Sequence, residues 1–294
     1  MRPLFIIIAL LFSQVFTIAQ ARIVFNANPY VVMNGGIYIV QANPATNAIS
    51  GAGRIISEAE TNRVRWMIGT STGTYTMPFG YTGAISIPHS ITIGTAGVGA
   101  TGYIDFSTYR TPTFMNTPWA TGVTHLTNNN TLLPNQTYVL DRWWITNAAS
   151  YTTKPALSGM LFTYIDAEWL AVGNTISEAN LQAQRFNTTA NVWYDMAPIG
   201  VVNTGANTVT ISTAVSSANF FRPWVLVDNL YPLPVVLSDF NATCNATNKT
   251  AELNWTTQSE TNNDYFMIER STDGFNFEQI AIVDGAGNSN ITLN

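Results

Sequence analysis

The chain has 294 residues, of which 46% are hydrophobic and only 10% are charged. The 12 basic residues are outnumbered by 17 acidic ones, and no run of Lys or Arg occurs. Proteins that bind nucleic acid through its phosphates need a basic patch, so the composition argues against that class. The length is sufficient for one large β domain or two modest domains, each with its own core.

The first 21 residues have the order of a secretory signal peptide. Arg2 is followed by an apolar run from Leu4 to Phe12 and then by Ala19-Gln20-Ala21. This is the positive, apolar, small-x-small order that a signal peptidase accepts. The apolar run is shorter than the roughly 20 residues that a membrane span requires. We therefore expect removal of residues 1–21 and a mature chain that is secreted or held at the outer cell surface, without a transmembrane segment. A retained anchor is the alternative.

From residue 22 to residue 231, polar and apolar residues alternate, or short apolar runs stand between turn residues. This period of two predicts β-strands. Asn34-Gly35-Gly36 is a hairpin signal, and Thr175–Gln184 predicts a helical turn or two. The predicted strands include residues 63–68, 84–88, 90–93, 102–107, 137–146, 160–169, 191–195, 207–212 and 223–227. The pattern predicts an all-β fold whose first domain is a large β-sandwich or a jelly-roll-like domain.

A domain boundary is predicted at YPLPVVL (231–237), because each proline restricts the residue before it to extended conformations. Residues 22–231 then form the first domain and residues 232–294 a second region. Strands are expected in PLPVVLSDFNATCN, TAELNWTTQSE, DYFMIERSTDG and FNFEQIAIVDG. Alternation places four large side chains on the inward faces of these strands: Leu253, Trp255, Phe266 and Ile268.

The second region resembles a known module over Leu233 to about Asn288. Its stretches LPVVLSDF and LNWTTQSETNNDYFMIERSTDGFNFEQIAIVDG are similar to the fibronectin type III-like module of secreted, type IX-exported Bacteroidota surface proteins, where the module precedes a sorting domain. Upstream, NRVRWMIGTSTGTYTMPFGY and DRWWI resemble the β-rich region of the same proteins. A complete module has seven strands. The resemblance therefore implies an incomplete fibronectin type III-like sandwich, either in a fragment of a longer chain or in a short form completed by strands from a partner molecule.

The sequence offers few groups for catalysis or metal binding. His89 and His125 lie in turn-rich segments, and neither has a Cys or carboxylate at metal-ligand spacing. No nucleophile elbow, P-loop or EF-hand motif occurs. We therefore expect no catalytic, cofactor or metal site, and no enzyme activity.

Two acidic pairs have alternative interpretations. Asp166 and Glu168 are two residues apart, which places both on one face of a strand and would suit calcium or paired catalytic carboxylates. A solvent-facing strand with its apolar residues inward explains the same pattern. Glu58 and Glu60 have the same two interpretations.

Aromatic residues are the stronger candidates for binding, because exposed indole faces stack on sugar rings. The chain has 8 Trp and 12 Tyr. Trp143 and Trp144 are adjacent and must point to opposite faces of a strand, so one of them is exposed or covered by a loop. The single cysteine, Cys244, is either a small apolar residue on a strand or has its partner in sequence beyond this chain.

Together these features predict a non-enzymatic secreted or cell-surface modular protein with an adhesion, matrix or spacer role. Surface polysaccharides or other surface proteins are the expected partners, and nucleic acid is not. The alternative is a carbohydrate-binding module that was once attached to an enzyme. A third hypothesis is a hydrolase in the 22–231 domain, which would require a cleft with facing carboxylates.

Overall fold

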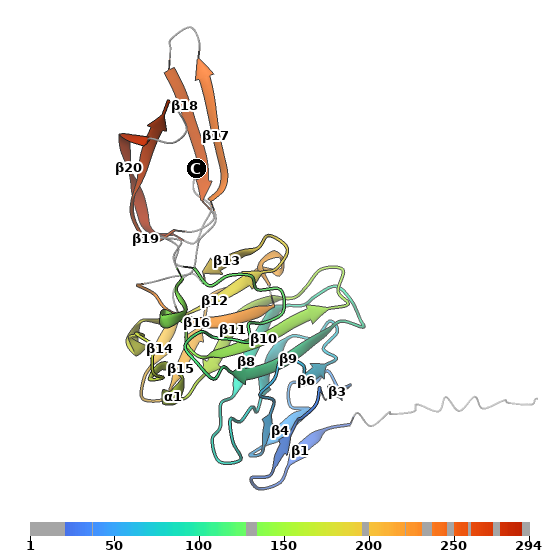
Figure 1. Ribbon diagram of the computed structural model, residues 1–294. Helices are drawn as coiled ribbons and strands as arrows, with labels where there is room; N and C mark the ends of the chain where they lie inside the picture. Colours follow the sequence, from blue (N-terminus) through green and yellow to red (C-terminus); the bar gives the residue numbers. More distant parts are fainter. Residues whose placement is uncertain are drawn as a thin grey trace, which may run out of the picture.

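A computed structural model describes residues 21–36, 38–127, 134–195, 200–220, 222–230, 237–245, 250–257, 260–272 and 277–289. Their regular secondary structure is almost entirely β, as predicted (Figure 1). The helical segments are short: α1 (Asp166–Trp169) and the 3-10 turns η1 (Gln136–Tyr138), η2 (Glu178–Asn180) and η3 (Ser217–Asn219). No helix among the described residues has the length and apolar character needed to cross a membrane.

Two sheets form the main body. The larger has the spatial order β13 (Val192–Asp195), β12 (Leu181–Asn187), β16 (Pro223–Asp228), β10 (Arg142–Ala149), β9 (Tyr103–Arg110), β6 (Arg63–Trp66) and β3 (Tyr38–Gln41). The smaller has the order β14 (Val201–Asn203), β15 (Thr208–Ile211), β11 (Ala156–Thr163), β8 (His89–Thr95) and β7 (Gly73–Met77). Neighbouring strands are antiparallel except β3 and β6, which are parallel. The two sheets pack face to face as a sandwich.

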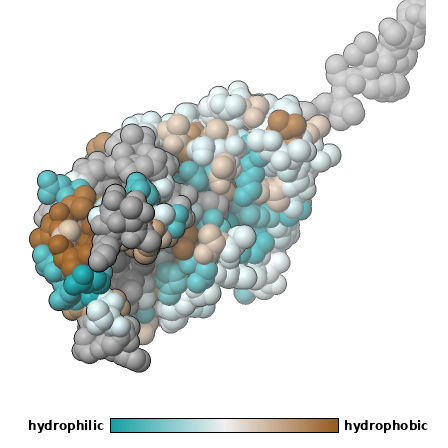
Figure 2. All heavy atoms as spheres, turned by 90° about the horizontal axis from the view of Figure 1, so that it is seen from above, coloured by the Kyte–Doolittle hydropathy of each residue, from teal (hydrophilic) through white to brown (hydrophobic). Residues whose placement is uncertain are grey.

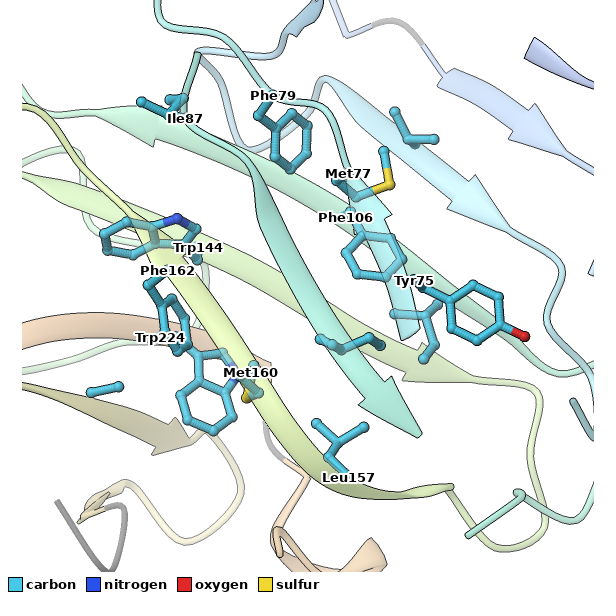
Figure 3. Close-up of a cluster of buried hydrophobic side chains, with 14 of the residues drawn as sticks. Tyr75, Met77, Phe79, Ile87, Phe106, Trp144, Leu157, Met160, Phe162 and Trp224 are labelled. Carbon is cyan, nitrogen blue, oxygen red and sulfur yellow. The ribbon is translucent and has the colours of Figure 1, made fainter. Parts of the chain in front are cut away.

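Alternation along the strands builds the core between the sheets. Trp144 and Trp224 from the larger sheet meet Phe162 from β11, with ring centroids 5.3 and 5.6 Å from the phenyl ring. Tyr75, Met77 and other apolar side chains of the smaller sheet extend the cluster (Figure 3). Full burial of each large apolar side chain is worth roughly 1.5–3 kcal/mol, so this layer holds the sheets together.

The outer face of the larger sheet is also buried. Trp143 points away from Trp144, as the sequence predicts, and lies with Trp193 in a second apolar cluster. Chain between β9 and β10 covers this face through Ala120, Val123 and Leu126. Both tryptophans are 0% exposed, so the loop-covered alternative for this pair is correct.

Four local predictions are wrong. Asn34-Gly35-Gly36 does not close a hairpin: β2 (Tyr30–Val32) on one side pairs in parallel with β5 (Arg54–Ile56), and β3 on the other side pairs in parallel with β6. Gly35 and Gly36 do have the positive φ of a turn, 79° and 81°. The turn is therefore real, but its flanking strands pair with segments further along the chain. A similar parallel pair joins β1 (Ile23–Phe25) and β4 (Ile49–Gly51).

The other three errors concern predicted strands. The strand predicted over 137–146 begins only at Arg142, because the 3-10 turn η1 precedes it. Residues 84–88 make only an isolated bridge, between Gly80 and Ser86. The strand predicted over 160–169 ends at Thr163, and α1 follows it. The helical turn predicted in 175–184 is the single turn η2, after which the chain enters β12.

The second region contains two hairpins, drawn in orange and red in Figure 1. β17 (Leu237–Asn245) pairs with β18 (Thr250–Thr257), and β19 (Glu260–Ser271) pairs with β20 (Phe277–Ser289). Trp255 and Phe266 meet across the space between the hairpins with centroids 5.5 Å apart. An open apolar groove of about 470 Å³ runs there, lined by Phe240, Leu253, Trp255, Phe266, Ile268 and Ile280. All four side chains predicted to face inward therefore line this groove.

The hairpins retain exposed apolar surface and unpaired edges. Figure 2, which views the molecule from above Figure 1, shows apolar residues gathered beside hydrophilic ones at this end. Phe240, Phe277 and Ile282 are each more than half exposed. Cys244 lies on β17 as expected, but is exposed. The predicted signal peptide and the YPLPVVL boundary lie outside the described residues, apart from Ala21 and Leu237.

Candidate functional site

The first acidic pair, Asp166 and Glu168, is not on a strand. The chain leaves β11 at Thr163 and turns into the four-residue helix α1. The carboxylate of Glu168 accepts the backbone N–H of Ile165 at 3.2 Å, which closes this turn. Asp166 is exposed whereas Glu168 is 0% exposed. Helical geometry therefore separates two carboxylates that a strand would have placed on the same face.

Glu168 belongs to a buried ion cluster. Arg142, also 0% exposed, donates from Nε to Glu168 Oε1 at 2.7 Å and from Nη1 to Glu58 Oε1 at 2.9 Å. Thr108 Oγ1 accepts a further bond from Nη1 at 3.1 Å. Burial by itself would lower the pKa of Arg142, but the two carboxylates hold it above its ordinary value. Glu168 and Glu58 thus neutralise a buried cation.

The second acidic pair also has structural partners. Glu58 lies in the loop after β5 with φ 41°, and its second carboxylate oxygen accepts the backbone N–H of Arg110 at 2.9 Å. Glu60 accepts the backbone N–H of Thr121 at 2.8 Å and pairs with Arg222. Both interpretations of this pair as one face of a strand are therefore wrong. The two side chains fix neighbouring segments to the larger sheet.

Both histidines contact groups of the scaffold. His89 begins β8 and is 0% exposed. Its Nδ1–H donates to the Leu161 carbonyl at 2.8 Å, so Nε2 accepts from Thr146 Oγ1 at 2.9 Å. Burial lowers the pKa of His89 to about 4. His125 contacts Thr127 Oγ1 and the Asn191 carbonyl, each at 3.2 Å. Among the described residues, no three His, Cys, Asp or Glu side chains are grouped to hold a metal ion.

Asp166 instead lines a polar cleft of about 560 Å³ at one end of the smaller sheet. The cleft lies between the β11–α1 segment, η2 and the turn from β14 to β15. Asn207, in this turn, donates from Nδ2 to Asp166 Oδ1 at 2.8 Å. Tyr164 donates from its hydroxyl to Glu178 Oε1 at 2.9 Å. Burial and the nearby Glu178 and Asp166 raise the pKa of Tyr164, so it stays a neutral donor.

Two buried polar atoms of the cleft lining have no partner among the described residues. Thr163 is 7% exposed, and its Oγ1 makes no hydrogen bond to the described residues. The same is true of the Trp169 indole Nε1, although this side chain is only partly buried. A buried donor or acceptor without a partner costs about 1–3 kcal/mol. These two atoms, together with the second oxygens of the carboxylates, are hydrogen-bonding groups that the described residues leave without a partner.

The tryptophans do not form a flat platform in the described part of the chain. Five of the 8 are 0% exposed: Trp66, Trp143, Trp144, Trp193 and Trp224. Trp169 lines the cleft and packs against the core. The sequence interpretation identified Asp166 but missed Thr163, Glu178 and Asn207, which reach the cleft from three segments. The only local signal was the turn-rich stretch 203–206, which lies directly before the strand predicted over 207–212.

No family model, curated protein or solved structure matches this chain, so the roles of these residues are argued from its own geometry.

Proposed function

We propose that the protein is a non-enzymatic secreted or cell-surface modular protein, in which the sandwich acts in adhesion, in a matrix or as a spacer. The observation that carries the proposal is the use of the buried ionisable groups. Glu168 is bonded to Arg142 at 2.7 Å, and His89 is bonded on both ring nitrogens. A general base needs a free lone pair directed at substrate, and these groups use theirs to join parts of the fold.

The compartment and the modular character are part of the same proposal. The order of charged, apolar and small residues in 1–21 supports export. The resemblance of Leu233–Asn288 to the fibronectin type III-like module of type IX-exported proteins supports a surface role. Two hairpins that face each other across an apolar groove fit such a module. N-terminal sequencing of exported protein should give Arg22, or Gln20 if cleavage follows Ala19, whereas a chain that still begins at Met1 contradicts export with cleavage.

The non-catalytic role is tested with the purified full chain on a panel of polysaccharides and esters. We expect no turnover above that of buffer. Cleavage that disappears in Asp166→Asn would contradict the proposal, provided that circular dichroism shows the variant to be folded. This substitution is informative because Asp166 is exposed at the cleft, so removing its charge leaves the buried cluster of Arg142 intact.

Carbohydrate binding is the second candidate function, and the cleft favours it. A flat strip of exposed tryptophans would have been the usual platform, but five of the tryptophans are in the cores. The cleft offers Trp169 beside two carboxylates and an amide instead. A pull-down of the full chain on insoluble polysaccharides such as cellulose and chitin tests this candidate, with Asp166→Asn as the comparison.

A further inference from the structure

We infer that the cleft formed by β11, α1, η2 and the β14–β15 turn is a binding site for a neutral saccharide. This inference rests on the carbohydrate-binding candidate above, and it adds the site, the charge class of the ligand and the residues that select it. The cleft has a volume of about 560 Å³, which is in the ordinary range for small-molecule sites.

The charge of the cleft excludes an acidic ligand. Asp166 and Glu178 are the only charged side chains among the described residues that line it. Two carboxylates without a lining cation repel a carboxylate, sulfate or phosphate group. Uronic acids and sialylated or sulfated glycans should therefore bind poorly.

The hydrogen-bonding groups favour hydroxyls over a cationic ligand. The carboxylates of Asp166 and Glu178 accept hydrogen bonds, and the Trp169 indole N–H can only donate. An ammonium group can satisfy the carboxylates but offers nothing to the indole, because it has no acceptor. A sugar hydroxyl both donates and accepts, so neighbouring hydroxyls of one ring can satisfy a carboxylate and an N–H together.

The buried hydroxyl of Thr163 is a second, independent observation that points to a ligand. Its side chain is on the outer face of β11, since Phe162 beside it points into the core. It is 7% exposed and lines the cleft, and its Oγ1 has no partner in the part of the chain that the structure describes. A buried hydroxyl without a partner destabilises the protein alone, and a ligand hydroxyl would supply the missing bond.

The residues around Asp166 hold it in place for this role. Asn207 has φ 52°, in the left-handed region that asparagine tolerates, and its backbone carbonyl accepts the N–H of Tyr164 at 3.0 Å. Its Nδ2 donates to Asp166 Oδ1 at 2.8 Å. One asparagine thus fixes both the backbone of the β11–α1 segment and one oxygen of the carboxylate. Asn207 is a positioning residue, and Asp166 is expected to contact the ligand through its other oxygen.

The test is a glycan array probed with the full chain, carrying neutral hexose and N-acetylhexosamine glycans beside uronic-acid, sialylated and free-amine glycans. Affinities for the best mono- and disaccharides are then measured by calorimetry. We expect binding to neutral glycans, ~10-fold or more weaker in Asp166→Asn and ~5-fold weaker in Thr163→Val. Trp169→Phe keeps an aromatic ring and removes the N–H, so it should weaken binding to a similar extent as Thr163→Val.

Thr163→Val separates binding from a structural role. Because Oγ1 has no partner in the described residues, the isosteric change should leave the melting temperature unchanged or raise it while it weakens binding. Thr210→Val, at an exposed position of the same sheet outside the cleft, is the matched control and should change neither quantity.

Three results would overturn the inference. Either no neutral glycan binds, or acidic or amine-bearing glycans bind better than neutral ones, or Asp166→Asn and Thr163→Val bind as tightly as the parent chain. None of these results contradicts the proposal of a non-enzymatic surface protein. Conversely, cleavage of a bound glycan would overturn the non-enzymatic proposal and leave the saccharide site in place.

Discussion

Thr146 Oγ1 donates to His89 Nε2 at 2.9 Å and so joins the two sheets of the sandwich through its interior. Thr146 is on β10 of the larger sheet and His89 is on β8 of the smaller one. The ring of Phe162 lies beside the imidazole with centroids 5.0 Å apart. A polar bond inside an apolar layer fixes the register of the sheets, since a shift would leave both groups buried and unsatisfied.

This relationship predicts how stability depends on pH. Burial lowers the pKa of His89 from 6.5 to about 4, so the folded state keeps the ring neutral while the unfolded chain takes up a proton. The contribution of His89 to stability is therefore fully present above pH 6.5 and is lost as the pH falls to about 4. Over this window the loss should approach about 3 kcal/mol.

The measurement is an NMR titration of the histidine ring signals, assigned with a His125→Asn variant. We expect no change of the His89 signal between pH 8 and pH 5. A His89 signal that titrates near pH 6.5 would show that the ring is open to water. Thr146→Val should destabilise the protein, because it leaves Nε2 without a donor in the core.

Asp141 predicts a pH effect of the opposite sign. It is 0% exposed, and Asn116 Nδ2 donates to its Oδ1 at 3.1 Å. Burial raises the pKa of Asp141 from 3.8 to about 6, so the folded state binds this proton more tightly than the unfolded chain. Its contribution to stability therefore grows as the pH falls from 6 to 4 and is lost as the pH rises through 6.

Asp141→Asn should stabilise the protein at pH 7 by about 2–3 kcal/mol, because no buried charge has to form. The gain should vanish near pH 4. Urea unfolding of the variant and the parent chain at pH 4, 5, 6 and 7 measures it, with the exposed Asp166→Asn as the control. A variant less stable than the parent at pH 7 would mean that the ionised carboxylate is needed in this position.

Substitution of Arg142 should destabilise the sandwich more than substitution at most other positions. Its removal leaves the fully buried Glu168 uncompensated, with Glu58 beside it. Breaking a buried ion pair from one side typically costs 3–5 kcal/mol, so we expect Arg142→Met to lower stability by about this amount. Arg63→Met is the control, because Arg63 is 25% exposed at 3.7 Å from Glu60, and it should cost about 1 kcal/mol or less.

Chemical unfolding followed by tryptophan fluorescence checks this prediction. The double variant Arg142→Met/Glu168→Gln should recover part of the loss, because the second change removes the unpaired charge. Equal losses in Arg142→Met and Arg63→Met would show that the buried cluster contributes no more than a surface pair.

The two hairpins should be less protected than the sandwich. Each is a sheet of only two strands, and isolated two-stranded hairpins are marginally stable in water. We expect backbone amides of 251–283 to exchange with deuterium faster than those of β9 and β10, which are central strands of the larger sheet. Hydrogen exchange followed by mass spectrometry measures both regions in one experiment. Strong and uniform protection across 251–283 in a monomer would contradict the prediction.

Deletion of 233–294 should leave the stability of the sandwich nearly unchanged. No described strand of the hairpins pairs with a strand of the two large sheets. The melting temperature of the truncated chain, compared with that of the full chain, provides the check. A fall of many degrees would mean that the hairpins support the sandwich.

Properties that depend on local backbone geometry could be predicted from the sequence alone. Side chains alternate across any strand, so the period of two predicted the all-β class. For the same reason adjacent Trp143 and Trp144 had to point to opposite faces of a strand, whereas the segment that buries Trp143 is known only from the tertiary structure. The same rule predicted that Trp255 and Phe266 face inward, and these side chains meet across the groove.

Which segments meet could not be predicted in this way and is known from the folded structure. Asn34-Gly35-Gly36 turns as predicted, yet β2 and β3 pair with β5 and β6, because the choice of partner depends on burial across the whole domain. Glu168 could not be assigned to Arg142 from the sequence, since the pair forms only when α1 folds against β10. The cleft around Thr163 and Asp166 is assembled from segments that are separated in the chain, so its polar groups carry no local pattern.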